Sequence, residues 1–518
     1  MSKSFLVLII TCLIFSVSCR TRNDEFVTIA LSDKFTTLDT LTTTGSEAAA
    51  ERVRNLMFNS LVKKNENFEY VGELAKEINP TEEGKVITFV LQDAVKFHNG
   101  KEFTSADVKY TFAELFKSNG FKAGAFADTI DEKLVEHIVS IVTPDSKTVV
   151  FTLNRATLQT RFLSNLVAIP IIPEGTIEQQ KTQPVGSGAF KFVNYDSSQN
   201  IIELAANADY WEGAPNIQKL RVKTVTDANS MQAELQSGGV DIAPLPSNLS
   251  PDTLKSLGNN PNLKVEQFNG SNIQYLQFNS QSAPLNNVKL RQAIAYGIDR
   301  EKIIEQLLFG QATIAHSILP VESWAYNAGT KYSFDSAKAK QLLQESGYKG
   351  EPLKFKVSAG NVAFSQYSQV IQNALRDLGL NVEIETLEPN VLRDQVSLGQ
   401  FQMNTGVWVG GNQDPIFLND LFNTKKIPSV KPKVPCCNRS RYSNAEVDKL
   451  LEQALDSTDR AQSKELYFKV QEFVSRDVPM FPLWYPANMV VANRRIGNIK
   501  ISPSGDWGFI RNLTIEKK

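Results

Sequence analysis

The side chains able to perform covalent or metal chemistry are few in this chain and widely separated. The sequence of 518 residues contains three histidines and four cysteines: His98, His137, His316, Cys12, Cys19, Cys436 and Cys437. Their spacing does not match the Cys and His clusters that hold structural zinc. The sequence also lacks a Gly-x-Ser-x-Gly nucleophile turn, a phosphate-binding Gly-x-x-x-x-Gly-Lys-Ser/Thr loop and a His-Glu-x-x-His pair. We therefore expect no catalytic residue, no metal site and no cofactor.

Two of these residue types have structural explanations. His98 begins a His-Asn-Gly turn, and we expect its ring to stabilise that turn by a hydrogen bond rather than to transfer a proton. Cys436 and Cys437 are neighbours in the sequence. A disulfide between adjacent cysteines closes a strained ring, so we expect two thiols there.

The N-terminus has the pattern of an export signal. A short basic start at Lys3 precedes an apolar run over residues 5–15, and the chain turns polar immediately after Cys19. A cysteine that follows small residues resembles the processing site of a bacterial lipoprotein. We therefore expect residues 1–18 to be a lipoprotein signal peptide and Cys19 to carry the lipid. The alternative is an ordinary signal peptide with an incidental cysteine.

Composition limits the remaining possibilities. The 55 basic and 56 acidic residues give a net charge of −1, which provides no field for capturing nucleic acid. Beyond the N-terminus no stretch approaches the ~20 apolar residues of a membrane span. About 500 residues exceed what one hydrophobic core usually supports, so we expect two or three lobes.

Apolar strands alternate with amphipathic helices along the body of the chain. Residues 337–347 and 369–379 each place apolar side chains on one helical face and end at a glycine that can cap the helix. Residues 382–385 then alternate apolar and acidic side chains, as a strand does. Residues 425–441 read as an exposed loop because they combine prolines and lysines. This β-α-β progression predicts an α/β fold with mixed sheets.

Residues 89–112 combine a short strand, a turn that needs a positive φ at Gly100, and a helix capped by Thr104 or Ser105. This segment resembles the signature of the extracellular solute-binding proteins of family 5, the binding lipoproteins of peptide-type ABC importers. Further segments resemble the family in the expected order: residues 38–40, 56–62, 72–75, 186–190, 209–215, 235–243, 288–300 and 442–451. The resemblance covers about residues 26–515.

The resemblance implies the two-lobed periplasmic-binding-protein (Venus flytrap) fold, of the type with an extra subdomain. It places lobe I in residues 26–55, 185–270 and 487–518, and lobe II in residues 271–486. Residues 56–184 would form the inserted subdomain. Residues 272–279 and 484–492 alternate at strand period and are expected to cross between the lobes.

The family holds its ligand between the lobes, and its cleft motif resembles residues 408–415 here. The ligand-binding residues implied by this motif are Trp408, Gly410, Gly411, Asn412 and Asp414. In peptide-binding relatives an aspartate at the place of Gly411 pairs with the ligand's α-amino group, and this chain has no carboxylate there. Residues 358–369, where dipeptide binders can carry an arginine for the ligand carboxylate, contain no arginine or lysine. An aspartate before proline also has a structural alternative, the capping of neighbouring amides.

Four further residues are candidates for the cleft. Tyr275, Phe278 and Tyr485 lie on or beside the expected crossing strands, where aromatic faces would stack on a ligand. Thr44 belongs to a turn that matches a family segment near the cleft. The alternatives are packing in the lobe cores for the aromatic residues and helix N-capping for the turn.

These observations predict a protein that captures peptides or peptide-like solutes outside the cytoplasmic membrane and delivers them to an ABC permease with its ATPase subunits. A non-peptide ligand in the same fold, such as an oligosaccharide, a metal chelate, haem or an opine, is one alternative. An orphan surface lipoprotein that acts as a sensor or adhesin is another. None of these functions requires catalysis.

Overall fold

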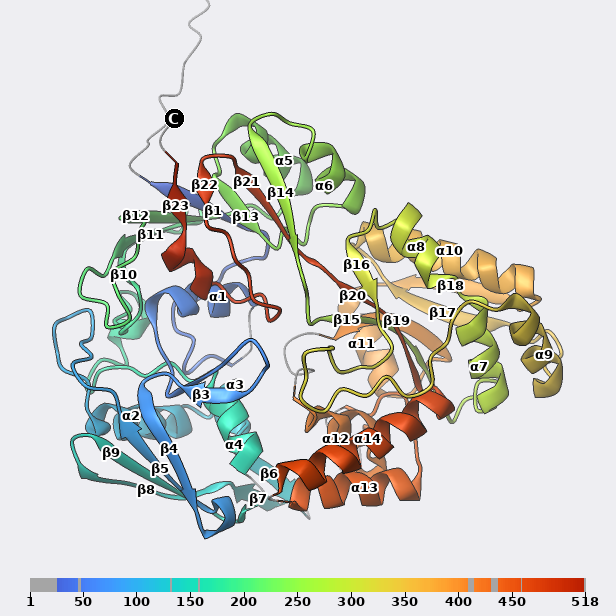
Figure 1. The fold of residues 1–518 in the computed structure, drawn as a ribbon, viewed down its shortest axis with the longest axis horizontal. Helices are drawn as coiled ribbons and strands as arrows, with labels where there is room; N and C mark the ends of the chain where they lie inside the picture. The colour runs from blue at the N-terminus through green and yellow to red at the C-terminus, as the bar shows by residue number, and fades with distance from the viewer. Residues whose placement is uncertain are drawn as a thin grey trace, which may run out of the picture.

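The computed structural model describes residues 26–44, 48–130, 133–156, 159–408, 414–429, 437–457 and 459–516. The predicted signal peptide, the lipidation site Cys19 and the candidates Gly410, Gly411 and Asn412 lie outside these residues. The described chain forms two α/β lobes and a smaller sheet-based part (Figure 1). We call them lobe I, lobe II and the inserted subdomain.

Lobe I is built on a seven-stranded mixed sheet of order β10-β11-β12-β1-β13-β21-β14. Its central strand β1 is parallel to both neighbours, β12 and β13. The strands are β1 (Val27–Leu31), β10 (Phe190–Asp196), β11 (Ile201–Ala206), β12 (Lys219–Thr224), β13 (Ile242–Pro244), β14 (Leu263–Phe268) and β21 (Asn488–Asn493). Helices α1 (Ala48–Met57), α5 (Ala228–Ser237) and α6 (Pro251–Leu257) flank the sheet, and the short strands β22 (Ile496–Gly497) and β23 (Thr514–Ile515) form a separate pair.

The inserted subdomain has a four-stranded sheet, β4-β5-β9-β8, and a separate hairpin, β2–β3. Its apolar side chains join those of lobe I in one continuous core. The elements are β2 (Val62–Lys64), β3 (Tyr70–Gly72), β4 (Ala75–Thr81), β5 (Val86–Leu91), α2 (Ser105–Ser118), α3 (Phe121–Gly124), β6 (Ala127–Ile130), β7 (Lys133–Glu136), β8 (Ile138–Asp145), β9 (Thr148–Leu153) and α4 (Gln159–Leu166).

The strand-turn-helix segment predicted over residues 89–112 is confirmed. Strand β5 ends at Leu91, Gly100 has a φ of 85°, and α2 begins at Ser105. The Asp107 carboxylate accepts the backbone N–H of Thr104 at 2.9 Å, which satisfies a donor at the helix start. Val108 and Phe112 of α2 are fully buried, as their i, i+4 spacing predicts.

Lobe II is built on a six-stranded mixed sheet of order β16-β20-β15-β19-β17-β18. One core packs α7, α8, α9 and α10 on one face of the sheet, and another packs α12, α13 and α14 on the other. The strands are β15 (Ile273–Phe278), β16 (Ala312–Ile314), β17 (Leu353–Ser358), β18 (Val382–Leu387), β19 (Met403–Trp408) and β20 (Met480–Pro486). The helices are α7 (Val288–Gly297), α8 (Arg300–Gln306), α9 (Ser336–Ser346), α10 (Val362–Leu378), α11 (Pro389–Ser397), α12 (Phe417–Phe422), α13 (Ala445–Asp456) and α14 (Arg460–Asp477).

The helices predicted in this lobe are present. Gly347 and Gly379 end α9 and α10 in the left-handed region, with φ values of 69° and 106°. The prediction for α10 was wrong at its start, because the helix begins seven residues earlier at Val362. The Asn361 side chain caps it by accepting the backbone N–H of Phe364.

Two strand crossings join the lobes, β14 to β15 and β20 to β21. They lie so close together that a Cβ on Gly270 would come within 2.0 Å of the Pro486 carbonyl oxygen. The Asn488 amide group fixes the crossing by donating to the carbonyls of Asn269, Ser502 and Pro503 at 3.0–3.1 Å. The predicted crossing over residues 484–492 therefore includes the end of β20 and most of β21. We retain the predicted lobe boundaries as a proposal.

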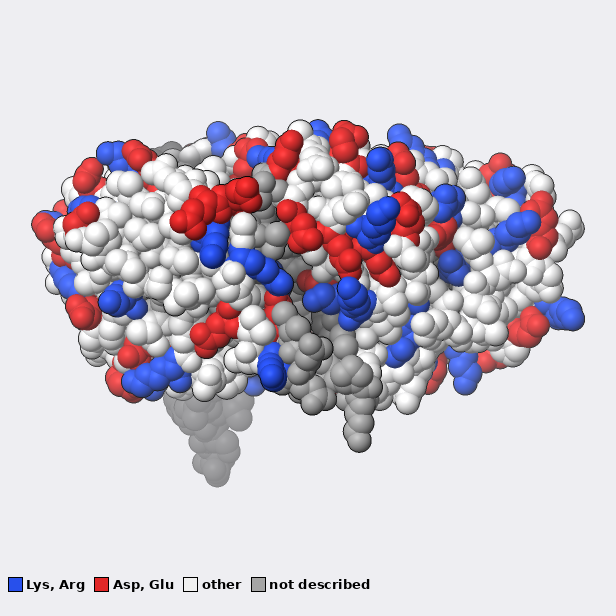
Figure 2. All heavy atoms as spheres, turned by 90° about the horizontal axis from the view of Figure 1, so that it is seen from below, with Lys and Arg blue, Asp and Glu red and all other residues white. Residues whose placement is uncertain are grey.

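Three further expectations concern chemistry and membranes. Cys437 is disulfide-bonded, so the expectation of a free thiol at this residue was wrong, and Cys436 lies outside the described residues. Among the residues that the structure describes, no helix is long and apolar enough to span a bilayer, and no group of three or more His, Cys, Asp or Glu side chains could hold a metal. Acidic and basic side chains are interspersed over the face in Figure 2, in keeping with the balanced charge.

Candidate functional site

The interlobe cleft is defined by the direction of the parallel strands in both sheets. In lobe I the parallel strands β1, β12 and β13 run in the same direction as β14, whose carboxyl end leads directly into lobe II. In lobe II, β17, β18 and β19 are parallel, and β19 ends at Trp408 opposite the first residue of β15. Both sheets therefore point the carboxyl ends of their parallel strands at the interlobe space, where α/β proteins bind ligands.

The β2–β3 hairpin of the inserted subdomain reaches across this space to lobe II. The Tyr70 hydroxyl donates a hydrogen bond to Asp414 Oδ2. Beside it, Arg460 Nη2 at the start of α14 pairs with Glu69 Oε1 at 2.9 Å. The Arg460 guanidinium also lies 4.9 Å from the centre of the Trp324 ring. The inserted subdomain is thus in contact with lobe II across the interlobe space.

Asp414 is 3% exposed, and both of its carboxylate oxygens are engaged. Oδ2 accepts from Tyr70, while Oδ1 accepts the backbone N–H of Ile416 at 3.0 Å. The amide-capping interpretation of Asp414 is therefore confirmed, and its predicted contact with a ligand stays a prediction. Burial lowers the pKa of Lys64 on the hairpin, and the charge of Asp414 opposes that shift. Burial and the Asp414 charge both raise the pKa of Tyr70.

Trp408 and Tyr275 lie on the same face of the lobe II sheet. Trp408 pairs with Ile273 at the cleft end of β15, and Tyr275 pairs with Gly406 two residues further along. A Cβ on Gly406 would lie 2.7 Å from the Tyr275 hydroxyl, so the glycine leaves room for the tyrosine side chain. The buried indole N–H of Trp408 has no hydrogen-bond partner among the described residues.

The structure places Phe278 and Tyr485 in the core rather than at the cleft surface. Phe278 is fully buried at the end of β15 that is distant from Trp408, on the opposite face of the sheet. The Tyr485 hydroxyl lies 2.8 Å from the Ser317 carbonyl oxygen and 2.5 Å from that of Leu319, and its ring is 4% exposed. Core packing describes both residues in this conformation, and Tyr275, which is 8% exposed, is also a buried member of the lobe II core.

The segment that includes Thr44 approaches the inserted subdomain. Thr44 itself is exposed, and the residues that follow it to 47 lie outside the described chain. The Asp39 carboxylate supports this segment by accepting the backbone N–H groups of Leu41 and Thr42 at 2.9 and 3.0 Å. The ligand contact predicted for Thr44 stays a prediction.

Several of the segments that resemble the family meet in a buried polar network centred on Asn59. The Asn59 amide oxygen accepts from Ser187 Oγ and Trp211 Nε1, at 3.1 and 3.3 Å. Its nitrogen donates to Glu73 Oε1 and the Tyr210 hydroxyl, at 2.9 and 3.1 Å. All four hydrogen-bonding positions of this amide are used. These motif residues therefore join the inserted subdomain to lobe I.

His98 serves the same junction. Its Nε2 lies 3.0 Å from the Gly188 carbonyl oxygen, and its Nδ1 accepts the Gly186 backbone N–H at 3.3 Å. The expected hydrogen bonding of the ring is present, but its partners lie in the segment 186–188 rather than in the His98 turn itself. Burial lowers its pKa from 6.5 to about 4, so a neutral ring can donate from Nε2 and accept at Nδ1 near neutral pH.

The cleft residues that sequence reasoning missed are Lys64, Glu69, Tyr70 and Arg460. Tyr70 and Asp414 are 344 positions apart, and Glu69 and Arg460 are 391 apart. No spacing rule links residues at such separations. In the sequence, only the position of the hairpin next to the family-like segment at residues 72–75 pointed to these residues.

Comparison with known families decides the assignment. The profile of the bacterial extracellular solute-binding proteins, family 5 (middle region), matches residues 69–428. The chain belongs to this family. The two-lobed fold predicted from the motifs is confirmed.

Relatives of this family 5 protein include binders of different ligands. Heme-binding protein A of Haemophilus influenzae is 29% identical over 462 residues, covering 84% of this chain and 82% of that protein. Oligopeptide-binding protein AppA of Bacillus subtilis is 27% identical over 499 residues, covering 91% and 88%. A solved structure of AppA in complex with a nonapeptide superposes with a TM-score of 0.72 at 24% identity, covering 95% of this chain and 99% of that chain.

The family fold is also shared at lower identity. The ABC transporter substrate-binding protein CtaP of Listeria monocytogenes superposes with a TM-score of 0.81 at 21% identity, covering 95% of this chain and 99% of that chain. Family 5 members are extracytoplasmic solute-binding proteins of ABC importers rather than enzymes.

Proposed function

We propose that this family 5 protein captures peptides or peptide-like solutes in the interlobe cleft and delivers them to an ABC permease. The ligand would stabilise the closed arrangement of the lobes relative to an open one. The name of AppA and the nonapeptide in its solved structure support an oligopeptide as the ligand class. We further propose that Cys19 carries a lipid anchor and that residues 1–18 are removed.

The unpartnered indole N–H of Trp408 is the observation that carries the ligand proposal. It lies at the carboxyl end of β19, at the cleft, and has no acceptor among the described residues. A buried donor without a partner costs about 1–3 kcal/mol, so the site favours a ligand that supplies an acceptor oxygen. The carbonyl groups of a peptide backbone are such acceptors.

The hydrogen bonds of Asp414 bear on whether the ligand's amino terminus is recognised. The cleft turn over residues 408–415 contains no other acidic residue, and both Asp414 oxygens are engaged. Without a charge-assisted partner of about 1.5–3 kcal/mol, a free α-amino group would contribute roughly 10- to 100-fold less affinity. We therefore propose peptides whose amino terminus is not read by this turn.

A non-peptide ligand is the second candidate. The relative named heme-binding protein A is 29% identical to this chain. A ligand without an ammonium group is equally compatible with the engaged Asp414. Haem, which presents carboxylates and a large apolar surface, is the non-peptide ligand that this comparison favours.

Thermal-shift measurements on the protein lacking residues 1–19 test the proposal. The panel contains di-, tri- and pentapeptides with free or acetylated amino termini, oligosaccharides, opines, haemin and nickel–histidine. A ligand at a hundred times its dissociation constant stabilises by about 2.7 kcal/mol, a shift of a few degrees in a protein of this size. Stabilisation by free and acetylated peptides alike is expected. Stabilisation by haemin, a chelate, an opine or a sugar, but by no peptide, would contradict the peptide proposal.

A further inference from the structure

A groove of about 920 Å³ separates the two lobes on the side of the crossing strands away from the cleft contacts. The groove is lined by residues of α6 and β14 of lobe I and of α8 and β16 of lobe II, and Figure 1 shows α6 and α8 above the crossings. The β2–β3 hairpin contacts lobe II through Tyr70 and Glu69. β14 and β16 are the edge strands of their sheets. The groove therefore lies beside one edge strand of each lobe.

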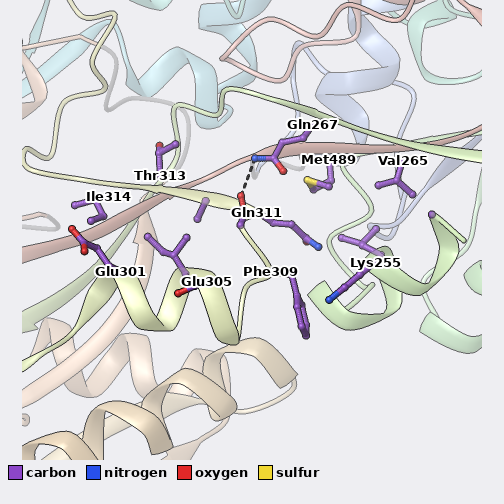
Figure 3. A pocket seen from close by; sticks show the side chains of 15 residues that line it. Lys255, Val265, Gln267, Glu301, Glu305, Phe309, Gln311, Thr313, Ile314 and Met489 are labelled. Carbon is purple, nitrogen blue, oxygen red and sulfur yellow. Dashed lines mark hydrogen bonds between the residues drawn. The ribbon is translucent and has the colours of Figure 1, made fainter.

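The floor of the groove is held together beside the crossings. Gln267 Nε2 of lobe I donates to the Gly310 carbonyl of lobe II at 3.0 Å (Figure 3). In the reverse direction, Gln311 Nε2 of lobe II donates to the Pro251 carbonyl of lobe I at 2.8 Å. These bonds and the strand crossings form a common pivot between the cleft and the groove.

Both walls above this floor carry apolar side chains. Val265 and Met489 on the lobe I side face the groove, as do Ile304, Phe309 and Ile314 on the lobe II side. Phe309 is 37% exposed. Burial of such apolar surface is favourable by about 25 cal/mol per Å², so the walls gain stability if they approach each other.

The walls are also complementary in charge. Lys255 on α6 of lobe I already contacts lobe II in this conformation, with its ammonium 4.5 Å from the centre of the Phe309 ring, and Glu301 and Glu305 on α8 line the lobe II wall (Figure 3). No ion pair of Glu301, Glu305 or Lys255 is present in the part of the chain that the structure describes. Approach of the walls would bring the lysine toward the two glutamates.

We propose that this groove is a latent interface that forms when the cleft opens and stabilises the ligand-free state. Because the groove and the cleft lie on opposite sides of one pivot, a rotation that separates the hairpin from Asp414 narrows the groove. The apolar walls and the Lys255–glutamate attraction then favour the open state. Closing the cleft breaks the contacts of this interface, so part of the ligand's binding free energy is used to break them. The groove therefore lowers ligand affinity although it lies outside the binding site.

Spin-label distance measurements on the ligand-free protein test this inference without any knowledge of the ligand. Labels on cysteines at Asn79 of β4 and Lys449 of α13, both exposed, report the separation across the cleft. The protein with these labels alone is expected to show a long-distance, open population. Glu305→Lys places like charges on both walls and should lower the open-to-closed ratio by about 3- to 10-fold.

Two variants and one control sharpen the result. Lys255→Glu combined with Glu305→Lys restores opposite charges and should restore the open population. Phe309→Ser removes apolar wall surface, together with the Lys255–Phe309 contact, without changing charge, and should lower the open population. Glu383→Lys, at an exposed position on β18 away from the groove, is the matched control and should have no effect.

Two outcomes would overturn the proposal. One is a ligand-free protein with no open population. The other is an open population that Glu305→Lys and Phe309→Ser both leave unchanged. Because no ligand is present, neither outcome depends on whether the peptide proposal is correct.

Discussion

The Tyr70 hydroxyl donates a hydrogen bond to the Asp414 carboxylate across the cleft, between residues 344 positions apart in the chain. The aspartate of the cleft turn thereby links the inserted subdomain to lobe II. In this conformation both oxygens of the one carboxylate in the turn are hydrogen-bonded within the protein. We propose that the β2–β3 hairpin, which makes this contact, also takes part in ligand binding.

Removal of the Tyr70 hydroxyl should weaken closure. In Tyr70→Phe the buried Asp414 oxygen loses a hydrogen bond to a charged acceptor, worth about 1.5–3 kcal/mol. We expect ligand affinity to fall about tenfold or more, measured by calorimetry with the ligand found in the panel. Asp414→Asn is the matched variant, since an amide can still bond both Tyr70 and the Ile416 N–H, and its loss should be smaller. Equal affinities of Tyr70→Phe and the unmodified protein would contradict this role.

The neighbouring ion pair should matter less. The side chains of Arg460 and Glu69 are 55% and 38% exposed, so water screens their 2.9 Å contact. Exposed pairs contribute about 0.2–1 kcal/mol. Glu69→Gln should therefore change ligand affinity by less than about fivefold, and the small effect should shrink further as salt is raised. A loss as large as that of Tyr70→Phe would show that the pair is shielded from solvent when ligand is bound.

Two substitutions of Trp408 separate its ring from its N–H group. Trp408→Phe keeps an aromatic face and loses the donor, whereas Trp408→Ala loses both. If the N–H bonds a ligand acceptor, Trp408→Phe should weaken binding by about 1 kcal/mol, and Trp408→Ala by more if the ring also stacks on the ligand. Unchanged affinity in both variants, measured by calorimetry, would assign Trp408 to core packing alone.

The Asn59 network should dominate the stability of the junction between the inserted subdomain and lobe I. Asn59→Leu removes the four hydrogen bonds of the buried amide, and Glu73 and Tyr210 keep only their bonds to Ser60 N–H and Glu212, so we expect the protein to be destabilised by about 2–4 kcal/mol. Thermal denaturation measures the change. Asn229→Ala, at an exposed position on α5, is the control and should change stability by less than about 0.5 kcal/mol. A melting temperature of Asn59→Leu equal to that of the control would refute the structural role.

His98 predicts a loss of stability in mild acid. Burial lowers its pKa from 6.5 to about 4 in the folded protein, so the unfolded chain binds the proton more readily between these values. The contribution is fully present above pH 6.5 and decreases as the pH falls toward 4, by at most about 3 kcal/mol. In His98→Gln the melting temperature should depend less on pH over this range.

His316 provides an internal reference for that experiment. Its pKa is also lowered to about 4, chiefly by burial, so it contributes with the same sign and is retained in His98→Gln. The difference between the two pH profiles therefore isolates His98. Profiles of equal slope would place the acid sensitivity elsewhere in the protein.

Local patterns in the sequence determined much of the architecture. Helices α2, α9 and α10 could be predicted because apolar spacing, caps and terminal glycines act within a few residues of one another. The start of α10 was missed because the Asn361 cap precedes a first turn without a clear apolar stripe. The family motifs fixed the fold because they recur in order along the chain.

Tertiary structure alone decided which residues meet. Aromatic residues at strand period look alike in sequence, yet register places Trp408 and Tyr275 in the core on one face of the sheet and Phe278 in the core on the other. The Tyr70–Asp414 contact and the groove walls join segments that only the packing of two lobes brings together. The sequence by itself determined the elements and the family, because those depend on local propensity and ordered motifs. The cleft and the groove on the other side of the crossings depend on long-range packing, which no local pattern encodes.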